Sequence, residues 1–208
     1  MANKSQERVL TYAIIGLIFF APFHLSAQTR EKEKSLLNFT REPGDQVLTL
    51  NLGVLTPLFS QKKVGAPLTS TKMSVGGWFA LSWEIHFLSM LRAGIDLGGA
   101  FSLAQTGKPI YLFNFLAKIT YVPQISSFDF PISLGVGLNG IRFDQNANTD
   151  FILKPSIGFY WNINAQWSIG TTLSYVFIPQ IYKGPTPPKT DSRLVNMFNT
   201  AISVRYHF

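Results

Sequence analysis

The chain has 208 residues, of which 46% are hydrophobic and only 14% are charged, and its formal net charge at pH 7 is +7. Soluble domains usually contain about 25% charged residues, so the composition argues against an ordinary soluble protein. The chain contains no cysteine, which excludes disulfides and thiolate metal sites.

The N-terminal segment has the organisation of a secretory signal peptide. A short charged region is followed by an apolar run over residues 9–25, and Leu25-Ser26-Ala27 supplies the small residues of a cleavage site. The alternative is an uncleaved membrane helix, because the apolar run is nearly long enough to cross a bilayer. Pro22 and His24 near its end disfavour that helix. We therefore expect residues 1–27 to be a signal peptide that exports the protein.

The next segment, residues 28–45, is polar and charged without a helical or strand period. We expect it to be a solvated periplasmic lead-in. No later segment has the eighteen or so uninterrupted apolar residues of a membrane helix. From Val47 onward, segments of about ten residues alternate apolar with small or polar residues, which is the pattern of a transmembrane β-barrel.

Eight such segments follow one another. The last one shows the pattern well, since Phe198, Ile202, Val204 and Tyr206 share one face while Asn199, Ser203, Arg205 and His207 share the other. An even number of strands brings both ends of a barrel to the same side. We predict an all-β fold, an eight-stranded antiparallel transmembrane β-barrel over residues 46–208. The predicted strands span residues 48–54, 73–84, 92–103, 113–121, 132–139, 154–162, 167–177 and 198–208.

The connections between the predicted strands alternate in length. Those near Leu88 and Asn164 are tight, whereas those over residues 57–71 and 179–193 are long. In bacterial barrels short turns face the periplasm and long loops face outward. Residues 105–108 and 144–149 form two shorter outer connections, and the turn over residues 122–129 is longer than the rule predicts.

Aromatic side chains gather on the outward face of the strands. Near the periplasmic ends we predict an interfacial girdle, because amphipathic rings favour the level of the lipid headgroups. Aromatic residues also favour strands in general, but that preference alone would scatter them along each strand. The predicted girdle consists of Trp83, Tyr121, Trp161, Trp167, Tyr206 and Phe208. A looser upper girdle would contain Tyr111, Phe143, Phe151, Tyr175, Phe177 and Phe198.

The signal segment, the eight alternating strands, the girdles and the ending Tyr206-His207-Phe208 resemble the small eight-stranded outer-membrane β-barrels of bacteria, such as the OmpA, OmpX and OmpW types. The resemblance covers residues 46–208 and selects no subfamily. It implies a monomer in the cell outer membrane, in contact with lipid and lipopolysaccharide. It also implies insertion by the barrel assembly machinery, which would read Tyr206 and Phe208 in the last strand.

Charged residues on the inward face are the predicted functional cluster. An eight-stranded barrel is just wide enough for its own side chains, and the inward positions are rich in Gly, Ala and Ser, with Trp78 and Tyr160 as the large exceptions. Glu84 and Arg92 are expected opposite each other across a hairpin, either in a salt-bridged plug or in a charged gate. Arg142 and Lys154 are expected to be solvated charges at the outer rim. The predicted lumen cluster is Glu84, Arg92, Asp96, Lys118 and Arg205.

The predicted outer loops are basic. They are either ordinary hydrated loops or a surface that binds an anionic leaflet, a host or a phage. The basic residues are Lys62, Lys63, Lys72, Lys108, Lys183, Lys189 and Arg193.

The sequence indicates no enzyme. Lipid A-modifying barrels need a histidine near the outer leaflet, whereas His86 and His207 fall at the periplasmic end. We find no metal-ligand spacing, no cofactor motif and no basic-aromatic pattern for nucleic acid. A soluble lipocalin-like barrel would have the opposite polarity, with its apolar face inside. We predict a non-enzymatic barrel with a narrow or closed lumen, either structural or, as the OmpW-type resemblance implies, passing small solutes or ligands. The alternative is a surface adhesin.

Overall fold

The computed structural model describes residues 41–62, 66–143, 146–180 and 193–208. The predicted signal peptide and residues 28–40 of the predicted lead-in lie outside the described residues, as do Lys63, Lys183 and Lys189 of the basic loops. Among the residues that are described, no helix is long and apolar enough to cross a membrane.

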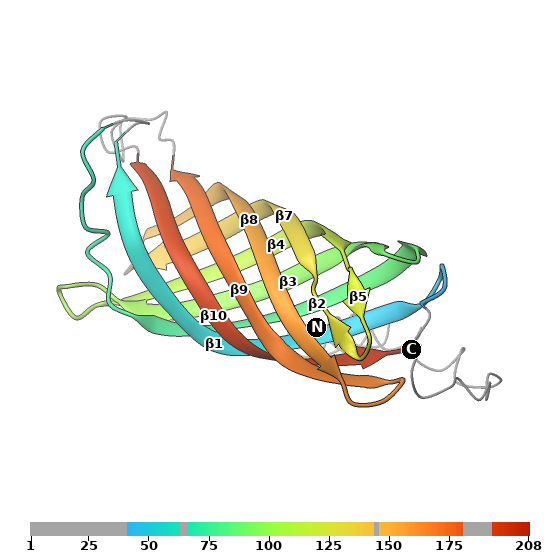
Figure 1. Cartoon of the computed structure of the whole chain (residues 1–208). Helices are drawn as coiled ribbons and strands as arrows, with labels where there is room; N and C mark the ends of the chain where they lie inside the picture. Colours follow the sequence, from blue (N-terminus) through green and yellow to red (C-terminus); the bar gives the residue numbers. More distant parts are fainter. Residues whose placement is uncertain (1–40, 63–65, 144–145, 181–192) are drawn as a thin grey trace, which may run out of the picture. The chain divides into compact units, whose positions relative to one another are not determined.

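The described chain is an antiparallel barrel (Figure 1). Neighbouring strands pair in the order β8-β7-β4-β3-β2-β1-β10-β9, and pairing of β8 with β9 closes the ring. The prediction of an eight-stranded antiparallel barrel is therefore confirmed. The eight barrel strands are β1 (Gln46–Gln61), β2 (Gly76–Leu88), β3 (Leu91–Leu103), β4 (Pro109–Tyr121), β7 (Ile132–Phe143), β8 (Asn146–Asn162), β9 (Trp167–Gln180) and β10 (Arg193–His207).

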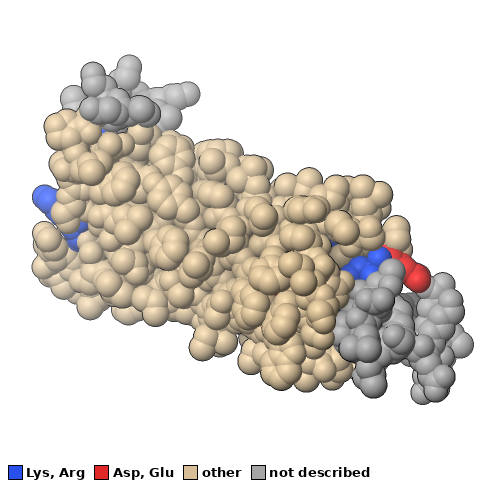
Figure 2. Space-filling model, in the orientation of Figure 1, with Lys and Arg blue, Asp and Glu red and all other residues tan. Residues whose placement is uncertain are grey.

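The alternating sequence produces a wall with two different faces. Along β4, Phe113, Phe115 and Ile119 are exposed on the outside, while Leu112 and Leu116 are buried inside. Figure 2 shows the opposite face of the wall, formed by β1, β10, β9 and β8, as almost free of charged atoms, which appear at the two ends instead. A wide apolar band on the outside of a barrel is suited to lipid rather than to water.

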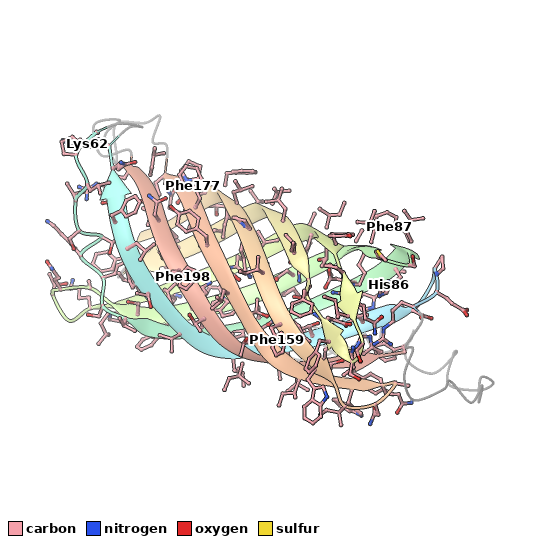
Figure 3. The ribbon with its side chains drawn as sticks, viewed as in Figure 1. Lys62, His86, Phe87, Phe159, Phe177 and Phe198 are labelled. Atoms are coloured by element: carbon pink, nitrogen blue, oxygen red, sulfur yellow. The ribbon has the colours of Figure 1, made fainter. Side chains whose placement is uncertain are left out.

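The two ends of the barrel differ. One end, called here the turn end, carries the β2–β3 and β8–β9 turns and the C-terminus. The opposite end, the loop end, carries the β1–β2, β3–β4, β7–β8 and β9–β10 connections. In Figure 3, His86 and Phe87 lie at the turn end and Lys62 lies at the loop end.

Several strands are longer toward the loop end than predicted. β1 was expected to end near Val54 but continues to Gln61. Pro57 has no amide hydrogen to donate to the neighbouring strand, and the register shift between Pro57 and Phe59 accommodates it. β7 and β8 extend to Phe143 and Asn146. The sequence pattern did not predict these extensions, because backbone pairing continues where apolar and polar residues no longer alternate.

The long turn after β4 contains a small hairpin. Its strands are β5 (Gln124–Ile125) and β6 (Phe128–Asp129), and Ser126 adopts a left-handed backbone conformation with φ of 54°. β6 also pairs with β8, with Asp129 opposite Tyr160. The hairpin thereby brings Asp129 into a buried position.

Tight packing between strands requires glycine next to the predicted charge cluster. Gly94 of β3 lies opposite Glu84 of β2. A Cβ atom at Gly94 would overlap the carbonyl oxygen of Trp83 and the Cα of Glu84. The missing side chain allows the two backbones to approach closely at the height of Glu84.

The interior has an apolar level toward the loop end. Large side chains fill it, in contrast to the expectation of mostly Gly, Ala and Ser inside. Phe143 packs against this cluster rather than joining an upper girdle. We call the following residues the apolar level: Leu55, Trp78, Ile110, Leu112, Leu116, Ile152, Val176, Ile178, Val195 and Met197.

Candidate functional site: the charged belt in the lumen

Seven charged side chains cross the interior on the turn-end side of the apolar level. The five predicted cluster residues all point inward from the barrel strands, and two further residues, Asp129 and Lys154, join them. Six of the seven are buried and Lys118 is half-buried. The charged belt consists of Glu84, Arg92, Asp96, Lys118, Asp129, Lys154 and Arg205.

Glu84 is the centre of the first ion-pair group. Lys118 Nζ donates to Glu84 Oε2 at 3.3 Å, and Arg92 Nη2 lies 3.9 Å from the same oxygen. The Thr120 hydroxyl donates to Glu84 Oε1. These contacts come from β2, β3 and β4, so the first group ties three neighbouring strands together from the inside.

The second group joins Asp96 to Lys154 across the lumen. Lys154 Nζ lies 3.3 Å from each Asp96 carboxylate oxygen, and the Ser82 hydroxyl donates to Oδ2 at 3.0 Å. The same ammonium lies 4.6 Å from the centroid of the Trp78 ring, within range of a cation–π interaction. β3 and β8 are not neighbours in the sheet, so this contact spans the barrel rather than following its wall.

The third group surrounds Arg205 near the turn end. Arg205 Nη1 lies 3.4 Å from Asp129 Oδ2, and Asn162 Nδ2 donates to Asp129 Oδ1 at 2.9 Å. The guanidinium carbon stands 3.6 Å from the centroid of the Tyr160 ring. The partner for Arg205 therefore comes from the β5–β6 hairpin, where we predicted only an over-long turn.

Together the three groups fill the cross-section of the barrel with paired charges. Removing one partner of a buried ion pair typically costs about 3–5 kcal/mol, because the remaining charge is left in a dry environment. The cavity beside the belt has a volume of about 20 Å³, and its lining includes Thr49, Asn51, Ser133 and every belt residue except Glu84 and Asp129. A volume of this size holds one or two water molecules rather than a solute.

Two expectations about individual charges are corrected. Lys154 was expected at a solvated rim, but it is buried and paired with Asp96, whereas Arg142 is exposed. The register places His86 opposite Arg92 and Gly94 opposite Glu84, so Glu84 and Arg92 meet diagonally. The turn lies at Ser89 and Met90 and not at Leu88, so the pairing that we inferred from a hairpin centred on Leu88 is displaced.

The aromatic residues predicted near the turn end lie on the outer face. Trp83, Tyr121, Trp161 and Trp167 are exposed. Tyr206 of β10 contacts two other rings: Trp167 of β9 in a tilted arrangement and Phe208 edge to face, each with a centroid distance of 4.8 Å. The placement agrees with an interfacial position, and a role of Tyr206 and Phe208 in assembly stays a prediction.

One serine–histidine contact lies at the turn end. Ser168 Oγ is 3.0 Å from His207 Nε2, but the same hydroxyl donates to Asn162 Oδ1 at 2.5 Å. His207 Nδ1 has no hydrogen-bond partner among the described residues, so none of these residues orients the ring as the acid of a catalytic triad does. In the described part of the chain, no group of three or more His, Asp or Glu residues is placed to hold a metal.

A protein-family model matches residues 28–206. A protein of Treponema pallidum (strain Nichols), named as uncharacterized, is 28% identical over 179 residues, which is 80% of this chain and 78% of the relative. An uncharacterized protein of Borreliella burgdorferi is 26% identical over 153 residues, covering 63% of this chain and 71% of the relative. These relatives add no activity.

Two crystal structures share the fold. Neisserial surface protein A has a TM-score of 0.60 and 14% identity, covering 79% of this chain and 97% of that protein. The outer membrane protein OprG from Pseudomonas aeruginosa has a TM-score of 0.54 and 12% identity, covering 82% of this chain and 98% of that protein. The predicted fold, that of the small outer-membrane barrels, is confirmed.

Proposed function

The chain belongs to the family whose model matches residues 28–206, and on that premise we propose that it is a non-enzymatic outer-membrane barrel with a closed lumen. Its role is structural or the limited passage of small solutes. The observation that carries this proposal is the charged belt, whose ion pairs span the interior beside a cavity of only about 20 Å³. An open porin would instead need a continuous aqueous channel.

The proposed location follows from the fold and the N-terminus. Residues 1–27 serve as a signal peptide for export, and the barrel then lies in the outer membrane with its turn end toward the periplasm. Lipid and lipopolysaccharide contact the exposed apolar wall. The barrel assembly machinery recognises the last strand, where Tyr206 and Phe208 face outward. The protein functions as a monomer.

A role without chemistry is supported by the placement of the histidines. His86 and His207 both lie at the turn end, away from an outer-leaflet substrate. Ser168, which lies within reach of His207, is at the same end and donates its hydroxyl hydrogen to Asn162. Nucleophilic catalysis requires an activated hydroxyl that a substrate can reach, and this arrangement does not offer one.

Single-channel recording in planar bilayers tests the closed lumen, with the native protein and Glu84→Ala side by side. We expect the native barrel to stay closed or to open only briefly. Glu84→Ala, which releases Lys118 and Arg92 from their shared carboxylate, should open more often. A large, permanently open conductance that is the same in both proteins would overturn the proposal.

A second candidate function is binding of an anionic surface at the loop end. Among the described residues of that end, Lys62, Lys72 and Lys108 are exposed and the single acidic residue, Asp150, is buried. Basic side chains on outer loops can neutralise phosphate or sulfate groups. If both barrels stay silent in bilayers although they are folded, solute passage is excluded and the surface role becomes the stronger candidate.

A further inference from the structure

A second cavity lies at the turn end and adjoins the charged belt. Its volume is about 320 Å³, at the lower end of the range of small-molecule sites, which is about 300–1,000 Å³. We call it the vestibule. Its lining includes Arg41, His86, Ser89, Arg92, Asp129 and His207.

The vestibule contains buried nitrogen atoms that form no hydrogen bond to any described residue. Arg92 is only 1% exposed, yet its Nε and Nη2 atoms make no hydrogen bond. His86 and His207 are 2% and 5% exposed, and one ring nitrogen of each, Nε2 of His86 and Nδ1 of His207, is likewise without a partner. Buried polar groups normally find a partner, because leaving one unpaired costs about 1–3 kcal/mol.

The nearby carboxylates do not meet this need. Glu84 Oε2 is 3.9 Å from Arg92 Nη2 but only 3.3 Å from Lys118 Nζ, and its other oxygen accepts from Thr120. Asp129 is bound by Arg205 and Asn162. The Arg92 charge is therefore only partly compensated by the protein.

A second guanidinium adds positive charge from the lead-in. Arg41 lines the vestibule, and its Nη2 lies 3.3 Å from His207 Nε2. Burial lowers the pKa of the Arg41 guanidinium from its ordinary value, while the Asp129 carboxylate opposes that shift. The lining contains two positively charged residues, Arg41 and Arg92, and one negatively charged residue, Asp129, so its net charge is positive.

We infer that the vestibule binds a small oxyanion, a phosphate or carboxylate group carried by a small periplasmic molecule, through the donors of Arg92. Guanidinium groups bind such oxygens in paired, charge-assisted hydrogen bonds. Ser89 and Ser126 at the exposed part of the lining leave room for the rest of the ligand. The site shares Arg92 and Asp129 with the belt but opens toward the turn end, so a ligand can bind there without passing through the lumen.

Titration of the full chain, folded in detergent, with inorganic phosphate tests the inference. Calorimetry at constant ionic strength should show one saturable site in the native protein. We expect Arg92→Gln to weaken binding by at least about tenfold, since hydrogen bonds to charged groups contribute that much. Lys62→Gln at the loop end is the matched control and should bind like the native protein. Equal affinity in Arg92→Gln and Lys62→Gln, or no saturable binding at all, would overturn the inference.

A rim variant covers the case in which Arg92→Gln does not fold. Ser89 is exposed in the β2–β3 turn and lines the vestibule without touching the belt. Ser89→Glu places a negative charge at the site and should weaken phosphate binding several-fold while the barrel stays heat-modifiable on gels. Unchanged phosphate binding in folded Ser89→Glu would contradict the proposed site.

Competition by acetate distinguishes phosphate from carboxylate ligands. Displacement of phosphate by acetate means that carboxylates also bind, and no displacement restricts the site to phosphate groups.

Discussion

The two levels of the barrel interior are filled by different chemistry. Toward the loop end, residues such as Leu112, Leu116 and Ile152 pack as in a soluble hydrophobic core. Toward the turn end, the charged belt fills the same cross-section with ion pairs and hydrogen bonds. Both levels fill the interior, but they should respond differently to substitution. Loss of a methyl group leaves a small gap, whereas loss of one charge strands another.

The largest effect is expected for Glu84→Ala in the belt. This change removes the carboxylate shared by Lys118, Arg92 and Thr120, and breaking a buried pair typically costs about 3–5 kcal/mol. The thermal unfolding of the barrel, followed by its heat-modified gel mobility, measures the loss. Lys62→Ala, at an exposed position in the loop end, should shift stability by less than about 0.5 kcal/mol. Similar shifts in the two variants would show that the belt contributes little.

An intermediate effect is expected when both partners of one pair are removed. Asp96→Asn and Lys154→Met should each destabilise the barrel, because each leaves the other residue without its partner at 3.3 Å. The double variant should lose less than the two single losses combined, since directly interacting pairs couple by about 0.5–3 kcal/mol. Urea unfolding of all four proteins gives this coupling energy.

The control for that cycle is Lys154→Met combined with Lys62→Ala. Lys62 lies at the loop end and makes no ion pair with the belt, so the two effects should add within about 0.5 kcal/mol. Additive effects for Asp96 and Lys154 as well would mean that their contact does not stabilise the barrel.

The sequence predicted the barrel well because its wall depends on alternation, which is a local property. All five predicted lumen charges point inward, since their faces follow from strand parity alone. Lys154 was also placed on the inward face, but its height was misjudged because β8 extends beyond its alternating segment to Asn146. Its pairing with Asp96 on a distant strand depends on barrel closure, which no local pattern encodes.

The inward position of Asp129 and the residues of the apolar level could not be predicted from the sequence either. Asp129 enters the lumen because the short strand β6 pairs with β8. The sequence indicated this hairpin only through the unusual length of the turn over residues 122–129. Residues such as Ile110, Ile152 and Ile178 lie where both faces of a strand are apolar, so alternation could not show which of them point inward.

The smallest effect is expected for Ile152→Val in the apolar level. Ile152 is fully buried on β8, two residues before Lys154, so it tests packing close to the belt without changing any charge. Removing one buried methyl group typically costs about 0.5–1.5 kcal/mol. Urea unfolding should therefore show a loss well below that of Glu84→Ala. A loss as large as that of Glu84→Ala would mean that the two levels act as one cooperative plug, and the distinction between a dispensable packing contact and an essential charge would not hold.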